Sequence, residues 1–153
     1  MVDVGCGPGG MREVAESMGV DWTGVDGDPA VCHSTSGIRM HDFTLGPVER
    51  VVDGGFDLAW SVEFLEHVEE RYVPNYMQLF AKCAIVACTA APPGYPGHHH
   101  VNCRSLEYWQ GVFAAHGFRF DAAATAELRS ASTMTKGFMA ATGMLFKRYD
   151  SER

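Results

Sequence analysis

The first ten residues combine a short apolar strand with a glycine-rich turn. Val2 and Val4 occupy alternate positions of a predicted buried strand, and four glycines follow within residues 5–10. Apolar residues then recur at the i, i+3, i+4 and i+7 spacing of one helix face, namely Met11, Val14, Ala15 and Met18. Strand, glycine turn and helix together are typical of the opening unit of a nucleotide-binding α/β sheet, because glycine lets the backbone approach a ligand closely.

Strands and helices are predicted in alternation along the rest of the chain. Further strands are expected at residues 20–26, 38–41, 56–60, 84–89, 118–121 and 138–146, with a turn at 54–55. Helices are expected at residues 11–18, 72–83 and 105–116, with a short helix or turn at 30–36. Residues 122–136 are interpreted as a polar connection with a short helix. Because no long crossover helix separates the last two strands, an antiparallel hairpin is predicted there, followed by a solvated tail at 147–153.

Capping residues mark the ends of the predicted helices. Gly19 and Gly117 are expected just past helix C-termini, where the left-handed conformation favours glycine. Asp28, which precedes Pro29, and Ser105 are expected to cap helix N-termini. The inner face of the third helix is predicted to consist of Tyr72, Tyr76, Leu79, Phe80 and Cys83. Such an apolar stripe indicates core packing rather than a binding site.

Composition and charge exclude several classes of function. The 153 residues suit a single domain, residues 1–153, and 46% of them are hydrophobic, which is enough to form a core. The net charge of −7, with 12 dispersed Lys and Arg residues, counts against nucleic acid and against an anionic membrane surface. No membrane span or signal peptide is expected. Five cysteines without a C-x-x-C pair favour a reducing cytoplasm over a disulfide framework or a zinc knuckle.

Acidic residues stand beside the glycine turn and at the end of the second predicted strand. Asp26 closes that strand, where a carboxylate can accept hydrogen bonds from both hydroxyls of a ribose, although it can also serve as a turn aspartate. Gly5, Gly7 and Gly10 match the G-x-G-x-x-G fingerprint of dinucleotide binding. Asp3 favours another ligand, because a pyrophosphate gains nothing from an acid at that point whereas a cationic group does.

The acid–glycine turn Asp3-x-Gly5-x-Gly7-x-Gly9 resembles that of class I S-adenosylmethionine (SAM)-dependent methyltransferases. Residues 56–68 strengthen the resemblance, since they read Phe-Asp, a short polar residue and then Glu-x-x-Glu-His-Val. The resemblance implies SAM as the cofactor, bound by Asp3, Gly5, Cys6, Gly7, Gly9, Asp26, Gly27, Asp42, Phe43, Ser61, Val62 and Glu63. Within this set, Asp42 is expected at the adenine amino group, and the backbone of residues 61–62 along the methionine side.

The resemblance extends over roughly residues 2–147 and implies a fold. We expect a Rossmann-like, doubly wound, mostly parallel seven-stranded sheet with a C-terminal antiparallel hairpin and helices on both faces. Family members usually carry helices before the first strand, whereas here that strand begins at residue 2. We therefore expect the N-terminal helices to be missing and the open cofactor site to be covered by a second copy of the chain or by residues 92–102.

Three histidines lie in a segment that is rich in proline and glycine, residues 90–102. This segment follows a buried parallel strand, so it is expected at the sheet edge where such folds bind ligands. His100 and His67 are the candidate catalytic residues, because imidazole can accept a proton near neutral pH. Alternatively, Glu66 and His67 only orient their loop, and positioning supplies the rate. The spacing of the histidines does not match a metal site, so no metal is predicted.

The sequence therefore predicts transfer of a methyl group from SAM to an oxygen, nitrogen or carbon of a small-molecule acceptor. Two alternatives belong to other classes. A non-catalytic SAM-binding partner or scaffold subunit is compatible with the same motifs. A nicotinamide enzyme would also use the glycine turn, but Asp3, Asp42 and the late hairpin argue against it.

Overall fold

The computed structural model describes residues 1–48 and 55–149, and its centre is a seven-stranded sheet with the order β3-β2-β1-β4-β5-β7-β6. The strands are β1 (Val2–Val4), β2 (Thr23–Asp26), β3 (Ile38–Met40), β4 (Phe56–Ser61), β5 (Cys83–Thr89), β6 (Phe118–Phe120) and β7 (Gly143–Arg148). Strands β1 to β5 pair in parallel, and β7 pairs antiparallel with both β5 and β6. The predicted mostly parallel sheet with a C-terminal antiparallel arrangement is confirmed.

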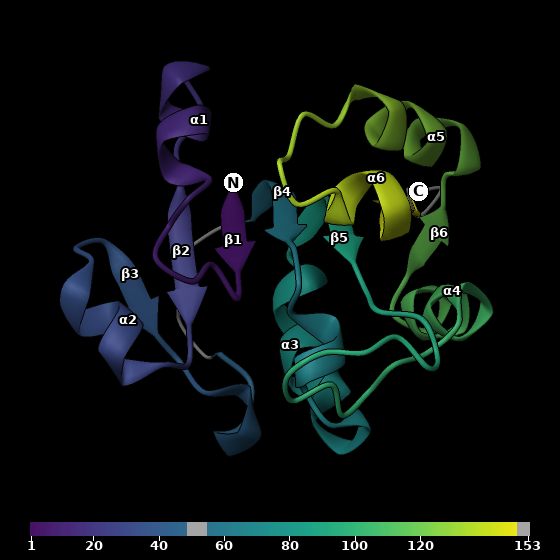
Figure 1. Cartoon of the computed structure of the whole chain (residues 1–153), viewed down its shortest axis with the longest axis horizontal. Coiled ribbons are helices and arrows are strands. Elements are labelled where there is room, and N and C mark those ends of the chain that lie inside the picture. The colour runs from purple at the N-terminus through teal and green to yellow at the C-terminus, as the bar shows by residue number, and fades with distance from the viewer. Residues whose placement is uncertain (49–54, 150–153) are drawn as a thin grey trace.

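Short helices connect these strands (Figure 1). The α-helices are α1 (Arg12–Ser17), α2 (Pro29–Ser34), α3 (Val73–Phe80), α4 (Leu106–Ala115), α5 (Ala122–Ala131) and α6 (Phe138–Thr142). The 3₁₀ helices are η1 (Phe43–Leu45), η2 (Leu65–His67) and η3 (Glu70–Tyr72). Two predicted caps are confirmed, because Asp28 accepts from the backbone of Ala30 and Ser105 accepts from that of Tyr108. The arrowheads of β1, β2, β4 and β5 point to the same edge of the sheet in Figure 1.

The region after β6 differs from its prediction. The short helix expected within residues 122–136 is longer than predicted, since it spans residues 122–131, and residues 138–142 are helical instead of extended. Asp121 starts α5 by accepting from the backbone of Ala124, and the Thr125 hydroxyl accepts from the backbone of Leu145 in β7. The first contact is a local helix cap, whereas the second fixes α5 on β7 and joins residues distant in sequence, which local patterning does not reveal. The last two strands are antiparallel neighbours although helices separate them.

Four further sequence expectations were wrong. On α1 only Ala15 is buried, whereas Val14 and Met18 of the predicted inner face are exposed, because the part of the chain that the structure describes places no element over them. Cys83 is the first residue of β5 rather than part of the preceding helix. Tyr72 ends η3 and is only half-buried. The second strand also begins later than predicted, at Thr23.

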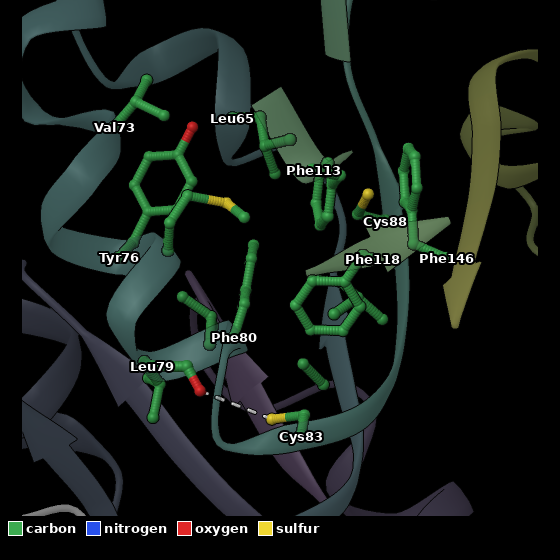
Figure 2. Packing of buried hydrophobic residues seen from close by; sticks show 14 of the residues in the cluster. Leu65, Val73, Tyr76, Leu79, Phe80, Cys83, Cys88, Phe113, Phe118 and Phe146 are labelled. Atoms are coloured by element: carbon green, nitrogen blue, oxygen red, sulfur yellow. Dashed lines mark hydrogen bonds between the residues drawn. The ribbon is translucent and has the colours of Figure 1, made fainter. Parts of the chain in front are cut away.

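Aromatic side chains fill the core on the α3 and α4 side of the sheet (Figure 2). The rings of Phe113 and Phe146 stack with centroids 3.8 Å apart, and Phe80 stacks on Phe113 at 6.0 Å. Tyr76 packs edge-on against Phe80 and, on its other side, against Phe64 beside the glycine turn. The core therefore reaches without interruption to the edge of the sheet where the candidate site lies.

Two findings concern the chain as a whole. All five cysteines are unpaired, in agreement with the prediction that there is no disulfide framework. None of the helices within residues 1–48 and 55–149 is long and apolar enough to cross a membrane. Part of the predicted turn at 54–55 and part of the predicted tail at 147–153 lie outside the described residues.

Leu65 and Leu45 provide a matched test of the core, because both lie in 3₁₀ helices but only Leu65 is buried. We expect Leu65→Ala to lower the free energy of unfolding by about 2–5 kcal/mol, since it removes packed methyl groups and leaves a cavity. Leu45→Ala should change it by less than about 0.5 kcal/mol, because its side chain is already in water. Urea unfolding of both variants measures the difference, and equal losses would contradict this description of the core.

Candidate active site

The glycine turn lies between the end of β1 and α1 and is held by β2. The backbone N–H groups of Gly5 and Cys6 donate to the carbonyl oxygen of Val25, at 2.9 and 3.3 Å. Gly5 has a φ of +69°, and a Cβ there would lie 2.5 Å from the ring of Phe64. Gly7 has a φ of +51°, and a Cβ there would meet no atom within 4 Å. Gly5 is therefore required for packing, whereas Gly7 borders open space that a ligand can approach.

Asp26 at the end of β2 joins the glycine turn to the next loop. Its Oδ2 accepts from the backbone N–H of Gly7 at 2.8 Å, and its Oδ1 accepts from that of Asp28 at 2.9 Å. Gly27 follows, and a Cβ there would lie 3.4 Å from the Cα of Asp42, so residues 26–28 pack against the end of β3. The structure thus brings together Gly7, Asp26, Gly27 and Asp42, all of which the sequence predicted as site residues.

Asp3 and Cys6 are ionisable groups beside this turn. The Asp3 carboxylate is buried, and its Oδ2 accepts from the indole Nε1 of Trp22 at 3.1 Å. Burial raises the pKa of Asp3 to about 6, with a smaller contribution from the charge of Asp26, although the Trp22 hydrogen bond opposes the shift. Burial also raises the pKa of the Cys6 thiol to about 12. Cys6 therefore stays protonated near neutral pH and is not a nucleophile.

Asp42 and Phe43 follow β3. The Asp42 side chain caps η1 by accepting from the backbone of Thr44 at 2.8 Å, and it is exposed. Phe43 is buried and packs edge-on against Phe64, with ring centroids 5.7 Å apart. Asn75 of α3 donates to the Phe43 carbonyl oxygen, which holds this loop against the core. Asp42 therefore faces solvent at the same sheet edge as the glycine turn.

The end of β4 meets the end of β1. The buried Ser61 hydroxyl donates to the carbonyl oxygen of Val4 at 2.9 Å. Glu63, two residues later, has a φ of +54°, which is uncommon for a residue with a side chain. Its backbone N–H donates to the Thr89 hydroxyl at the end of β5, at 2.9 Å. Residues 61–63, including the predicted Val62, thus run across the carboxyl ends of β1, β4 and β5 and place the Glu63 side chain there.

Glu66 is a buried acid near Glu63. Its side chain is 0% exposed, and neither carboxylate oxygen has a hydrogen-bond partner among the described residues. Burial raises the pKa of both acids, and the charge of Glu66 raises that of Glu63 further. The Glu66 carbonyl oxygen accepts from the backbone of Val101 and Asn102, at 2.9 and 3.0 Å. This pair of bonds fastens the histidine-containing segment to η2.

The two predicted catalytic residues lie side by side. The rings of His67 and His100 are perpendicular, with centroids 4.9 Å apart. His67 Nδ1 lies 3.2 Å from the carbonyl oxygen of His99, and His100 Nδ1 lies 3.3 Å from that of Tyr95. Burial lowers the pKa of His67, and the neighbouring His100 lowers it further. His98 points into solvent and takes no part in this pair.

A pocket of about 410 Å³ opens beside Glu63. It is lined by Glu63, Ala91, Tyr95, Lys136, Gly137, Phe138, Ala141 and Thr142. Sequence reasoning missed Lys136 and Phe138, because the segment around them was assigned to a connection and a strand. A larger hollow of about 520 Å³ between α4, α5 and α6 shares no residue with the predicted site.

Comparisons with known proteins agree with this geometry. Residues 2–87 match the family described as "Methyltransferase domain". Two curated relatives are ubiquinone biosynthesis O-methyltransferases. The one from Azorhizobium caulinodans is 36% identical over 78 residues, which are 46% of this chain and 30% of the relative. The one from Methylobacterium nodulans is 31% identical over 101 residues, 61% of this chain and 37% of the relative. The chain thus matches less than two fifths of the length of either relative.

Solved structures share the fold at low sequence identity. The magnesium protoporphyrin IX methyltransferase of Synechocystis PCC 6803 with bound SAH has a TM-score of 0.67 at 13% identity, over 97% of this chain and 73% of that one. A TehB-like SAM-dependent methyltransferase from Corynebacterium glutamicum has the same TM-score and identity, over 97% and 79%. Because the family match spans more than half of the chain, the protein belongs to the methyltransferase domain family, among the class I methyltransferases whose cofactor is SAM.

Proposed function

We propose that the protein transfers a methyl group from SAM to a nucleophilic atom of a small-molecule acceptor. The observation that supports this most is the meeting of the acid–glycine turn, Asp26 and residues 61–63 at the carboxyl ends of β1, β2 and β4. In the sheet, β2 and β3 lie on one side of β1, whereas β4, the next strand along the chain, lies on the other side of β1. Such a switch in strand order is where open α/β sheets bind their ligands.

The proposed cofactor site follows from the chemistry of these groups. Asp26 accepts from the ribose hydroxyls, and the glycine turn with Cys6 and Gly27 forms the backbone surface against which the cofactor packs. Asp42 and Phe43 meet the adenine. Asp3 attracts the cationic methionine end, which carries an ammonium and a sulfonium group, and residues 61–63 line the same end.

The proposed acceptor site is the pocket beside Glu63. Its volume of about 410 Å³ suits a small molecule. Lys136, Tyr95 and Thr142 provide polar groups beside Glu63, whereas Ala91, Phe138 and Ala141 form the apolar part of the wall. The names of the two curated relatives specify O-methyl transfer, which supports a hydroxyl as the acceptor group. His67 and His100 are the proposed catalytic residues, which assist removal of the hydroxyl proton as oxygen attacks the methyl carbon.

The first experiment titrates the protein with SAM and then assays release of S-adenosylhomocysteine over a panel of small hydroxylated acceptors. We expect SAM to bind, and Asp26→Ala to weaken binding by about 1–3 kcal/mol, or roughly 5- to 150-fold, because hydrogen bonds to a carboxylate are lost. Asp28→Ala is the control, since Asp28 caps α2 and should affect stability but not affinity. Equal affinities for both variants and the wild type would contradict the assignment. SAM binding without turnover on any acceptor would favour a non-catalytic subunit.

The glycine turn has a matched control in Gly19, which also has a positive φ and open space at its Cβ position. Both Gly7→Ala and Gly19→Ala should therefore cost about 1 kcal/mol of stability through the left-handed backbone. Only Gly7→Ala should weaken SAM binding, by about tenfold or more, because its methyl group would occupy space next to the cofactor. Isothermal titration of the two folded variants measures this difference. Unchanged affinity of the Gly7 variant would place the cofactor elsewhere.

Asp3 is expected to lower stability while it favours binding. Its carboxyl pKa is about 6 when folded and about 3.9 in an unfolded chain. The folded state therefore binds this proton more tightly, so unfolding free energy is lost as pH rises from about 4 to about 6. Asp3→Asn should stabilise the unliganded protein, with a gain larger at pH 8 than at pH 5 by about 1 kcal/mol.

The same variant should bind SAM more weakly at pH 8, because the charge opposite the cationic end is gone. Urea unfolding and SAM titration at both pH values measure the two effects. Asp57→Asn is the control for stability, since Asp57 is exposed on β4. A stability gain that does not change with pH, or undiminished SAM affinity, would refute the role given to Asp3.

A further inference from the structure

Glu66, His67 and His100 form a cluster of three groups that can bind a metal ion. One ligand atom from each residue lies within 4.8 Å of the others. Glu66 and His67 belong to η2, whereas His100 comes from the segment that follows β5. The hydrogen bonds from Val101 and Asn102 to the Glu66 carbonyl oxygen hold these two segments together. The cluster is therefore built by backbone contacts and not by a chance approach of mobile side chains.

Both imidazoles turn Nδ1 toward a backbone carbonyl oxygen, which leaves Nε2 as the nitrogen available to a metal ion. A carbonyl oxygen can only accept a hydrogen bond, so the Nδ1 atoms that face the carbonyl groups of His99 and Tyr95 carry the protons. When such a ring is neutral, its Nε2 atom has a free lone pair. Metal-ligating histidines in general donate their other ring N–H to a carbonyl or carboxylate oxygen, which fixes the ring orientation. His67 and His100 both have this arrangement.

The third group is a buried carboxylate without a partner. Glu66 is fully buried, and both of its oxygens lack a hydrogen-bond donor among the described residues. No ion pair within the described part of the chain includes it either. A buried carboxylate is strongly destabilised unless it is protonated, paired or bound to a cation. A bound cation is one way to stabilise the ionised Glu66 side chain, and a proton held between Glu66 and the neighbouring Glu63 is another.

We propose that Glu66, His67 and His100 bind a divalent cation of the zinc class. Two imidazoles and one carboxylate are a ligand set that zinc takes in catalytic sites, where a fourth position stays open, whereas Mg²⁺ prefers oxygen ligands only. Ligand atoms around a tetrahedral zinc ion are about 3.4 Å apart, so small side-chain rotations suffice to close the cluster from its present spacing. Sequence spacing did not reveal this site, because His100 lies 33 residues after His67 and the two meet only in the fold.

The role of the cation in catalysis rests on the proposed function, and in it His67 and His100 assist removal of the proton by holding the cation and not by accepting the proton themselves. Its open position would receive the acceptor hydroxyl, because the cluster lies next to Glu63 and Tyr95 of the acceptor pocket. A bound cation acidifies a hydroxyl, so the O–H bond breaks and the proton passes to water at the mouth of the site. The oxygen then forms a bond to the methyl carbon of SAM. The carbon–sulfur bond breaks, and sulfur keeps the electron pair in S-adenosylhomocysteine.

The test is direct titration of the chelator-treated full chain with Zn²⁺, and with Co²⁺ as a spectroscopic probe. We expect one Zn²⁺ per chain and a visible Co²⁺ spectrum of a low-coordinate nitrogen–oxygen site. His67→Ala, His100→Ala and Glu66→Gln should each weaken Zn²⁺ binding by at least about tenfold. Glu66→Gln keeps the side-chain shape, and both histidines are only partly buried, so these variants should fold.

His98→Ala is the matched control, because it removes an exposed histidine of the same run that lies outside the cluster. It should leave Zn²⁺ affinity unchanged. The proposal is overturned if the wild type binds no Zn²⁺, if His98→Ala weakens binding as much as His100→Ala, or if Glu66→Gln has no effect. SAM titration of the metal-free protein separates the two proposals, since SAM binding that persists without Zn²⁺ supports the proposed cofactor site whatever the metal result.

Discussion

The end of β1 is hydrogen-bonded from both sides, and the geometry of the candidate site depends on this constraint. On one side the backbone of Gly5 and Cys6 donates to Val25 of β2, and on the other the Ser61 hydroxyl of β4 donates to Val4. The glycine turn is therefore not a free loop, because its start is fixed to two neighbouring strands. Asp26 extends the same network to Gly7, so the end of β2 is hydrogen-bonded to the turn as well.

Buried acidic side chains are the second common feature of the site. Asp3 belongs to β1, directly before the glycine turn, and Glu66 belongs to η2, after β4, each with too few donors to compensate for burial. A folded chain that keeps such groups gives up stability unless a ligand neutralises them. The proposed ligands are both cationic, with the methionine end of SAM near Asp3 and a divalent ion at Glu66. At both positions the charge of the proposed ligand is therefore opposite to that of the ionised acid.

The segment after β5 connects these parts. It contributes Tyr95 to the acceptor pocket and His100 to the cluster with Glu66, and its backbone is hydrogen-bonded to η2. Its proline and glycine residues prevent helix or strand pairing, so its shape is set by contacts with residues 63–67. One irregular segment therefore positions both the proposed acceptor wall and the proposed catalytic groups.

The sequence by itself determined the features that arise from local patterns. Alternating apolar residues, glycines and caps such as Asp28 and Ser105 act within a few residues, so most parallel strands and helix starts followed from them. The glycine turn and Asp26 were found for the same reason. Only the tertiary structure decided how far the helix within residues 122–136 extends and that it packs on β7. It also decided that α1 leaves Val14 in solvent and that His67 meets His100, because these outcomes depend on contacts between residues distant in sequence.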